Sequence, residues 1–331
     1  MTSSTVSDAD LHARRRAVFR AVLVPPGPAL PDRDAPADGG AEAGAGRVAL
    51  DGGVSWFAAD GLLEWIEWQN AGQFADAAAC GWLALLRCWR AHEGRLPESA
   101  PPAQPRWIDA VARASGVRAA WLGAGLDAET RDALAEPGMG VPTDPKHPGR
   151  DAPQALLRAA AFGMVPGLED RYVTSFARQS AVLTHGHPST WVASAVQALL
   201  VAHLLRGAEL PTACEAARAW LGESAADAGA DVRRAWDATV LPALQGTAPA
   251  EREPAAGSAE VLCRAVVQAL APGVEPGGRA QDDAVTAVLT AQVQAAAGRR
   301  FAHTSAKLHP EPGTGEAVAA ELAERWRAAT T

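Results

Sequence analysis

The sequence predicts an all-α fold, and three observations support this prediction. Apolar residues recur along most of the chain with the 3.6-residue period of an amphipathic helix. Alanine, the residue with the highest helix propensity, is abundant throughout and allows helices to pack closely. No segment alternates between apolar and polar residues as a half-buried strand does. We therefore expect a single-domain, multi-helix orthogonal bundle.

The N-terminal region is predicted to contain one helix and one long loop. The helix covers residues 8–23 and ends where a cluster of prolines begins. Residues 25–46 contain almost no large apolar side chain and are rich in Pro, Gly, Ala and Asp, which is typical of a mobile loop. Residues 1–48 are thus expected to form this helix and flexible loop, and residues 49–331 the rest of the one structural domain.

The remaining helices are predicted from the same periodicity, with Pro, Gly or polar residues between them. They cover residues 60–70, 74–92, 106–114, 127–135, 153–162, 168–183, 189–205, 211–221, 230–244, 258–271, 282–297 and 315–329. Residues 96–105 are predicted to be a Pro-rich link and residues 137–152 a long polar loop. Helices of this length with short connections pack as an orthogonal or bundle-like array.

The composition limits the classes of partner. Hydrophobic residues make up 48% of the 331 residues, enough to bury a substantial core. The formal net charge is −8, so the surface as a whole repels phosphate backbones and we expect no nucleic-acid partner. The N-terminus lacks a signal-peptide pattern, and no uninterrupted apolar run reaches the roughly 18 residues of a membrane span. We expect no membrane partner and a cytoplasmic location.

Cysteine and tryptophan are expected to serve the core. The four cysteines, Cys80, Cys88, Cys214 and Cys263, lie in predicted helices and form no Cys-x-x-Cys pair. They are therefore predicted to be reduced and mostly buried thiols. Eleven Trp residues stand against one Tyr, and most of these Trp side chains are expected to be buried anchors.

Three sequence strings carry a resemblance to a known family. They are Ala181-Val-Leu-Thr-His-Gly-His-Pro-Ser-Thr190, which precedes an apolar run to Leu205, Asp60-Gly-Leu-Leu-Glu-Trp-Ile-Glu-Trp68, and Ala79-Cys-Gly-Trp-Leu-Ala-Leu-Leu-Arg87. Together, over about residues 49–298, they resemble the ADP-ribosylglycohydrolase family. The resemblance implies an all-α hydrolase in which two Mg²⁺ ions hold and cleave ADP-ribose linked to an acceptor.

The resemblance also implies where metal ligands should lie. The family's Thr-Asp-Asp-Thr segment corresponds to Ala49-Leu50-Asp51-Gly52, and its late Asp-x-Asp-Thr segment to Gln281-Asp282-Asp283-Ala284. One carboxylate of each pair remains, Asp51 and Asp283, with Asp282 one position out of register. The Gly-Asp turn expected after the first helix falls at Val24-Pro25, which has no carboxylate.

Asp51, Asp282 and Asp283 are therefore remnant metal-ligand candidates, and a one-metal site built from them is one interpretation. The competing interpretation is structural, since Asp is also favoured in loops and at helix N-termini. Mg²⁺ is the cofactor that the resemblance implies. Because the carboxylates are depleted, we expect that no metal is bound.

Arg158 is a candidate for binding phosphate. The family's glycine-rich loop lets the backbone approach a diphosphate or ribose, and its equivalent here is Arg150-Asp-Ala-Pro-Gln154. The glycines are absent, and Pro153 removes a backbone donor. The helix that follows keeps Arg158, Phe162 and Gly163 of the family pattern.

His185 and His187 are the other ligand-binding candidates. A His-x-His turn suits a transition-metal pair, but no Cys or carboxylate flanks the two residues at ligand spacing. In the family this turn belongs to the scaffold beside the site. The competing interpretation is that both side chains bond to loop backbone.

Two functions follow from the resemblance. The first is a pseudoenzyme with eroded metal ligands and a binding or regulatory role, whose partner is ADP-ribose, a related nucleotide-sugar or a protein. The second is an active hydrolase with a remodelled site that cleaves an ADP-ribosyl N- or O-glycosidic bond. A third interpretation is a helical scaffold that docks a protein partner through exposed aromatic side chains. The residues considered for that surface are Trp65, Trp68, Trp121 and Trp191.

Overall fold

A computed structural model gives the positions of residues 6–23, 52–113, 126–223, 227–247, 257–271, 281–298 and 315–330. Within these residues the chain forms thirteen α-helices and one short 3-10 helix, and no strand. The all-α prediction is confirmed. The loop predicted at residues 25–46 lies outside the described residues.

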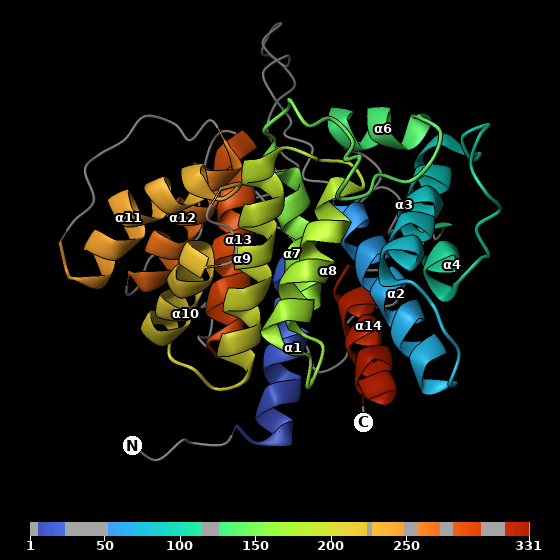
Figure 1. Ribbon diagram of the computed structural model, residues 1–331. Coiled ribbons are helices and arrows are strands. Elements are labelled where there is room, and N and C mark those ends of the chain that lie inside the picture. The colour runs from blue at the N-terminus through green and yellow to red at the C-terminus, as the bar shows by residue number, and fades with distance from the viewer. Residues whose placement is uncertain are drawn as a thin grey trace, which may run out of the picture.

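The helices form one bundle (Figure 1). Their bounds are α1 (Asp8–Leu23), α2 (Gly52–Asn70), α3 (Ala77–Glu93), α4 (Trp107–Arg113), α6 (Ala128–Ala135), η2 (Pro153–Ala155), α7 (Leu156–Gly163), α8 (Asp170–Val182), α9 (Pro188–Leu205), α10 (Leu210–Glu223), α11 (Ala230–Leu244), α12 (Ser258–Leu270), α13 (Gln281–Ala296) and α14 (Gly315–Thr330). The helix α1 packs against α13 and α14 and buries Val18 and Phe19, so it is part of the core.

The start of α2 differs from the prediction. The helix begins at Gly52 rather than at Asp60. Its first turns are apolar or small on every side, and Val54, Trp56 and Phe57 are all buried. Because this part of the helix lacks an exposed polar face, the amphipathic period that marks a helix in sequence is absent there.

The helix α9 is the centre of the bundle. It packs against α7, α8, α10, α12 and α13, and nearly all of its side chains are buried. Among the described helices it alone is long and apolar enough to cross a membrane, but 83% of it is buried inside the protein. Its apolar character therefore reflects a position surrounded by other helices.

Two buried glutamines fix the register of the central helices. Gln197 on α9 donates to Gln292 Oε1 on α13 at 2.7 Å, and Gln292 donates to Leu157 O on α7 at 3.0 Å. At one end of the bundle, Arg14 reaches both Leu204 O and Ala296 O, near the C-terminal ends of α9 and α13. These two helices therefore run parallel, and their N-termini lie together at the opposite end.

A buried charge cluster joins α2, α3 and the start of α4. Asp60 is fully buried and accepts hydrogen bonds from Arg106 Nε and Trp107 Nε1, both at 2.7 Å, and from Arg87 Nη2 at 3.2 Å. Arg87 also donates to Glu64 at 3.0 Å. The polar residues of the strings at 60–68 and 79–87 therefore serve helix packing.

The cysteine and tryptophan predictions can be compared with the structure. All four cysteines are free and buried, as expected. Trp56, Trp236 and Trp326 are fully buried core residues. Six of the other described tryptophans are only partly buried, and 42% of the surface of Trp68 is exposed, so fewer of them are fully buried than the sequence predicts.

We predict that Asp60→Asn costs about 3 kcal/mol of unfolding free energy, because the buried guanidinium of Arg87 loses part of its compensating charge. The matched control is Glu67→Gln, which removes one partly exposed ion pair to Arg106 and should cost about 0–1 kcal/mol. Urea denaturation of both variants measures the difference. Equal, small losses would show that the cluster contributes little to stability.

We predict that Gly163→Ala is strongly destabilising, by about 3 kcal/mol or more. A Cβ at this position would clash with Ala198 O and lie 2.8 Å from Ala202 N, so α7 and α9 would have to separate. Gly149→Ala is the control, because a Cβ there meets no atom within 4 Å. Chemical denaturation should leave the control within about 0.5 kcal/mol of the wild type.

Candidate functional site

Residues 184–188 form the turn between α8 and α9, and this turn packs against the loop that precedes η2. Gly186 donates its N–H to Lys146 O at 2.6 Å, and a Cβ at Gly186 would clash with the same oxygen. Glycine is therefore required at this position. The N–H of His185 donates to Ala181 O at 2.7 Å and so extends the hydrogen bonding of α8. The turn holds its two histidines in fixed and different surroundings.

His187 caps α9 and is partly accessible. Its Nδ1 accepts a hydrogen bond from the N–H of Ser189 at 3.3 Å, which satisfies one of the free donors at the helix start. The same Nδ1 lies 3.9 Å from Asp151 Oδ1. His187 is thus the histidine of the turn that a ligand in solvent can reach.

Asp151 joins the starts of α9 and α12. Its Oδ1 accepts the N–H of Ser258 at 3.0 Å and lies 3.2 Å from Thr190 Oγ1, which is itself 2.8 Å from Ser258 Oγ. A Cβ at Gly257 would lie 2.5 Å from Asp151 Oδ2, so a larger residue there would displace this carboxylate. Asp151 was not among the candidate site residues predicted from the sequence. It could have been found because it lies in the segment that is equivalent to the family's glycine-rich loop.

Arg158 points into the protein and holds the turn. It is almost fully buried, and its Nη2 donates to Ser180 O at 2.8 Å and to Thr184 Oγ1 at 2.7 Å. Burial lowers the pKa of this guanidinium to about 10, and the charge of Asp127 opposes the shift. The geometry gives Arg158 a positioning role for the end of α8, and its assignment as a phosphate ligand stays a prediction.

The remnant metal-ligand candidates lie at the start of α13 and in the segment before α2. Asp51 lies outside the described residues. Asp282 and Asp283 belong to the first turn of α13, but their side chains are also outside the description. The N-terminus of α13 is at the same end of the bundle as that of α9, so the backbone brings Asp282 and Asp283 toward the histidine turn.

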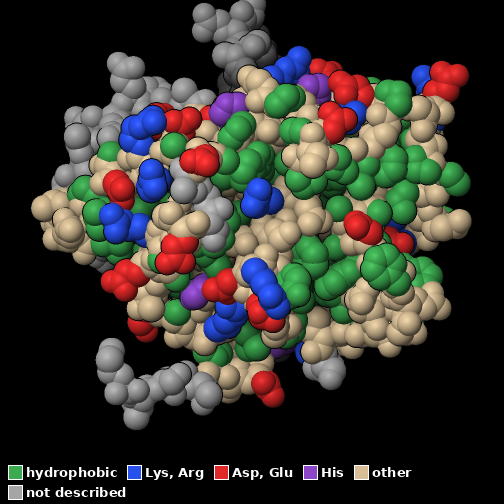
Figure 2. Space-filling model, viewed as in Figure 1, with side chains coloured by type: hydrophobic (Ala, Val, Ile, Leu, Met, Phe, Trp, Pro, Cys, Tyr) green, Lys and Arg blue, Asp and Glu red, His purple; other side chains and the backbone are tan. Residues whose placement is uncertain are grey.

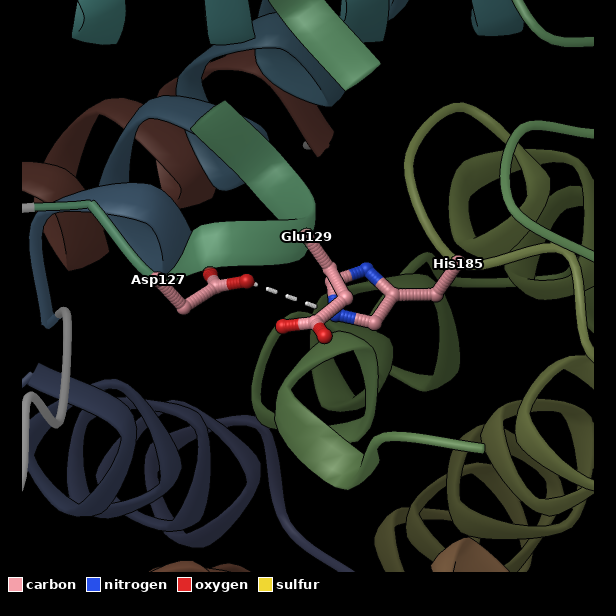
Figure 3. A group of neighbouring side chains, drawn as sticks. All are labelled: Asp127, Glu129 and His185. Carbon is pink, nitrogen blue, oxygen red and sulfur yellow. Dashed lines mark ion pairs between the residues drawn. The ribbon is translucent and has the colours of Figure 1, made fainter. Parts of the chain in front are cut away.

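A second cluster of possible metal ligands lies between α6 and the turn (Figure 3). Asp127 caps α6 by accepting the N–H of Thr130 at 2.9 Å, and Glu129 follows in the first turn. His185 Nε2 lies 3.5 Å from Asp127 Oδ1. The ligand atoms of Asp127, Glu129 and His185 all lie within 4.8 Å of one another. Sequence analysis gave Asp127 only as the start of a helix.

The electrostatics of this cluster favour an ionised carboxylate. Burial alone would raise the pKa of Asp127, but the interactions with His185 and with Thr130 outweigh burial and lower this pKa to about 2. Asp127 therefore carries a negative charge deep in the protein at neutral pH. Such a group requires a compensating positive charge nearby.

The tryptophans considered for a docking surface are mostly packed. Trp65 makes an edge-to-face contact with Phe176, and Trp191 lies under the guanidinium of Arg178 at 4.2 Å. Only Trp68 of this set is an exposed side chain among the described residues, and Trp121 lies outside them. Figure 2 shows that hydrophobic side chains gather on the right half of this face, over α2, α3 and α8.

We predict that Asp151→Ala lowers the unfolding free energy by about 1–3 kcal/mol, because the N–H of Ser258 loses its acceptor. Asp144→Ala, in the exposed part of the same loop, should change stability by less than about 0.5 kcal/mol. Thermal and urea denaturation test the pair. Indistinguishable variants would mean that water replaces the carboxylate of Asp151 without cost.

Comparisons with known proteins agree on the family. The sequence model described as ADP-ribosylglycohydrolase matches residues 12–304. A solved structure titled "ADP-ribosylglycohydrolase-related protein complex" has a similar fold, with a TM-score of 0.52 over 96% of this chain and 99% of that chain, at 19% sequence identity. The search of curated proteins found no match. Since the family model covers most of the chain, this protein belongs to the ADP-ribosylglycohydrolase family.

Proposed function

We propose that this protein is a pseudoenzyme of its family, with a binding or regulatory role in place of efficient two-metal hydrolysis. The donor set supports this proposal. The segments 49–52 and 281–284 each keep one carboxylate in register, Asp51 and Asp283. Mg²⁺ needs an octahedron of oxygen ligands, and each carboxylate supplies both charge and geometry. Two aligned carboxylates do not fit two Mg²⁺ ions, and we derive no hydrolytic step through them.

The observation that carries the proposal is the position of Asp151. In the family a glycine-rich loop precedes the equivalent of α7, and its backbone N–H groups suit a diphosphate. Here the equivalent segment places a carboxylate at the starts of α9 and α12, where Asp151 accepts the N–H of Ser258. A carboxylate that occupies these donors repels a phosphate from the same position. Pro153, which has no N–H, starts η2.

The alternative is an active hydrolase that cleaves an ADP-ribosyl N- or O-glycosidic bond through a remodelled site. It is favoured by the two adjacent carboxylates, Asp282 and Asp283, at the first turn of α13. In this alternative Asp283 and Asp51 act as ligands for one metal ion or as general bases.

An assay of ADP-ribose release separates the two functions. We expect that wild-type protein, incubated with an ADP-ribosylated protein and Mg²⁺, releases no more ADP-ribose than a protein-free control. The opposite result would be Mg²⁺-dependent release that Asp283→Asn abolishes. Asp282→Asn is the matched control, because this neighbour is one position out of register with the family motif. Release lost only in Asp283→Asn would establish the hydrolase.

Calorimetric titration with ADP-ribose, with and without Mg²⁺, tests whether ADP-ribose is the ligand of the pseudoenzyme. Binding that does not depend on metal would identify a reader of ADP-ribose or a related nucleotide-sugar. In that case His187→Ala should weaken binding, because His187 is the accessible side chain of the turn. Binding that requires Mg²⁺ would contradict the loss of the metal site.

A protein partner is the second class of ligand that we propose. Phe74, which follows α2, is 95% exposed, and Trp68 and Tyr172 are each 42% exposed. Exposed aromatic side chains of this size are enriched at protein interfaces. If ADP-ribose does not bind under either condition, the binding role belongs to this surface.

A further inference from the structure

The cluster of Asp127, Glu129 and His185 uses none of the residues on which the proposed function depends. Two of its members come from the start of α6, and the third comes from the turn before α9 (Figure 3). Figure 3 shows the two carboxylates and the imidazole ring turned toward one another. Residues that are distant in sequence thus offer one nitrogen and two oxygen ligands at one place.

His185 has an unsatisfied ring nitrogen. The side chain is fully buried, and no described residue makes a hydrogen bond with its Nε2. The nearest carboxylate oxygen, Asp127 Oδ1, is 3.5 Å away, which is longer than a hydrogen bond. A buried polar atom without a partner is costly, and in native proteins it often marks a missing ion or water.

The other ring nitrogen is held in a way that suits metal binding. His185 Nδ1 lies 2.7 Å from Thr184 Oγ1, and this hydroxyl accepts a hydrogen bond from Arg158 Nη2 at 2.7 Å. The hydroxyl oxygen has two lone pairs, so it can also accept the proton of Nδ1. In this tautomer Nε2 presents its lone pair to the carboxylates. Metal-binding histidines typically donate their second N–H to such a neighbour.

A proton shared by His185 and Asp127 would not explain why Glu129 also lies beside them. A proton on Nε2 would pair His185 with Asp127, and it would leave the carboxylate of Glu129 without a role. Among the described residues Glu129 forms no ion pair and no side-chain hydrogen bond. It is the least buried member of the cluster, so it can move toward an ion held by the other two.

We propose that Asp127, Glu129 and His185 bind one divalent transition-metal ion, and that Zn²⁺ fits this donor set best. One imidazole and two carboxylates are a ligand set that Zn²⁺ accepts at about 2.0–2.2 Å, with a position left for water. Mg²⁺ is a poor match because it prefers an octahedron of oxygens. Thr184 and Arg158 then act as the hydrogen-bonded support of His185, which gives the buried arginine a role.

The test is calorimetric titration of the chelator-treated, full-length protein with Zn²⁺. We expect one equivalent to bind and the melting temperature to rise with Zn²⁺. Glu129→Gln should weaken binding at least about 100-fold, since even the loss of an outer-shell partner costs 10–100-fold. Asp132→Asn is the matched control. It makes the same change one turn further along α6, at an exposed residue that pairs with Arg150.

Other outcomes would overturn the proposal. Equal Zn²⁺ affinity in the wild type and in Glu129→Gln would place the ion elsewhere. The absence of stoichiometric binding in the wild type would show that a proton, and not a metal, lies between Asp127 and His185. Because the buried His185→Gln variant can fail to fold, Co²⁺ absorption provides a second readout. Wild-type protein should show d–d bands without thiolate charge transfer, and Glu129→Gln should lose them at the same Co²⁺ concentration.

Discussion

The positions of the other helices follow from the burial of α9 on every side. A helix that is apolar all round has no face that can be left in water, so α9 lies among seven other described α-helices. Its buried Gln197 donates to Gln292 Oε1 of α13, and Gln292 in turn donates to Leu157 O of α7. Because α9 cannot rotate or slide, the turn at its N-terminus is also fixed, and with it the directions of His185 and His187.

This fixed turn holds His187 and His185 in two different environments. His187 lies at the start of α9 and accepts the N–H of Ser189. The nearby Asp151 accepts the N–H of Ser258 at the start of α12. His185 is fully buried and lies between Asp127, the N-cap of α6, and Thr184, to which the buried Arg158 donates. The first environment is open to a solvent-borne ligand. The environment of His185 is not accessible to solvent, so electrostatic interactions there are strong and an unpaired polar atom is costly.

The packing of the bundle depends on residues outside the family's metal motifs. The bundle depends on apolar helix faces, on close approaches such as that of Gly163, and on the buried ion pairs of Asp60. None of these requires the carboxylates of the family's metal motifs. The fold is therefore compatible with the pseudoenzyme that we propose.

The all-α class, the family and most helix bounds could be predicted from the residues alone, and α1 and α11 end where the periodicity ends. Periodicity and breaker residues are local signals, and they are lost where a helix is buried on all sides, as at the start of α2. Helix packing, in contrast, turns Arg158 inward to Ser180 and brings His185 to Asp127 and Glu129. These contacts join residues far apart in the chain, and their energy depends on distances and burial that no local pattern records.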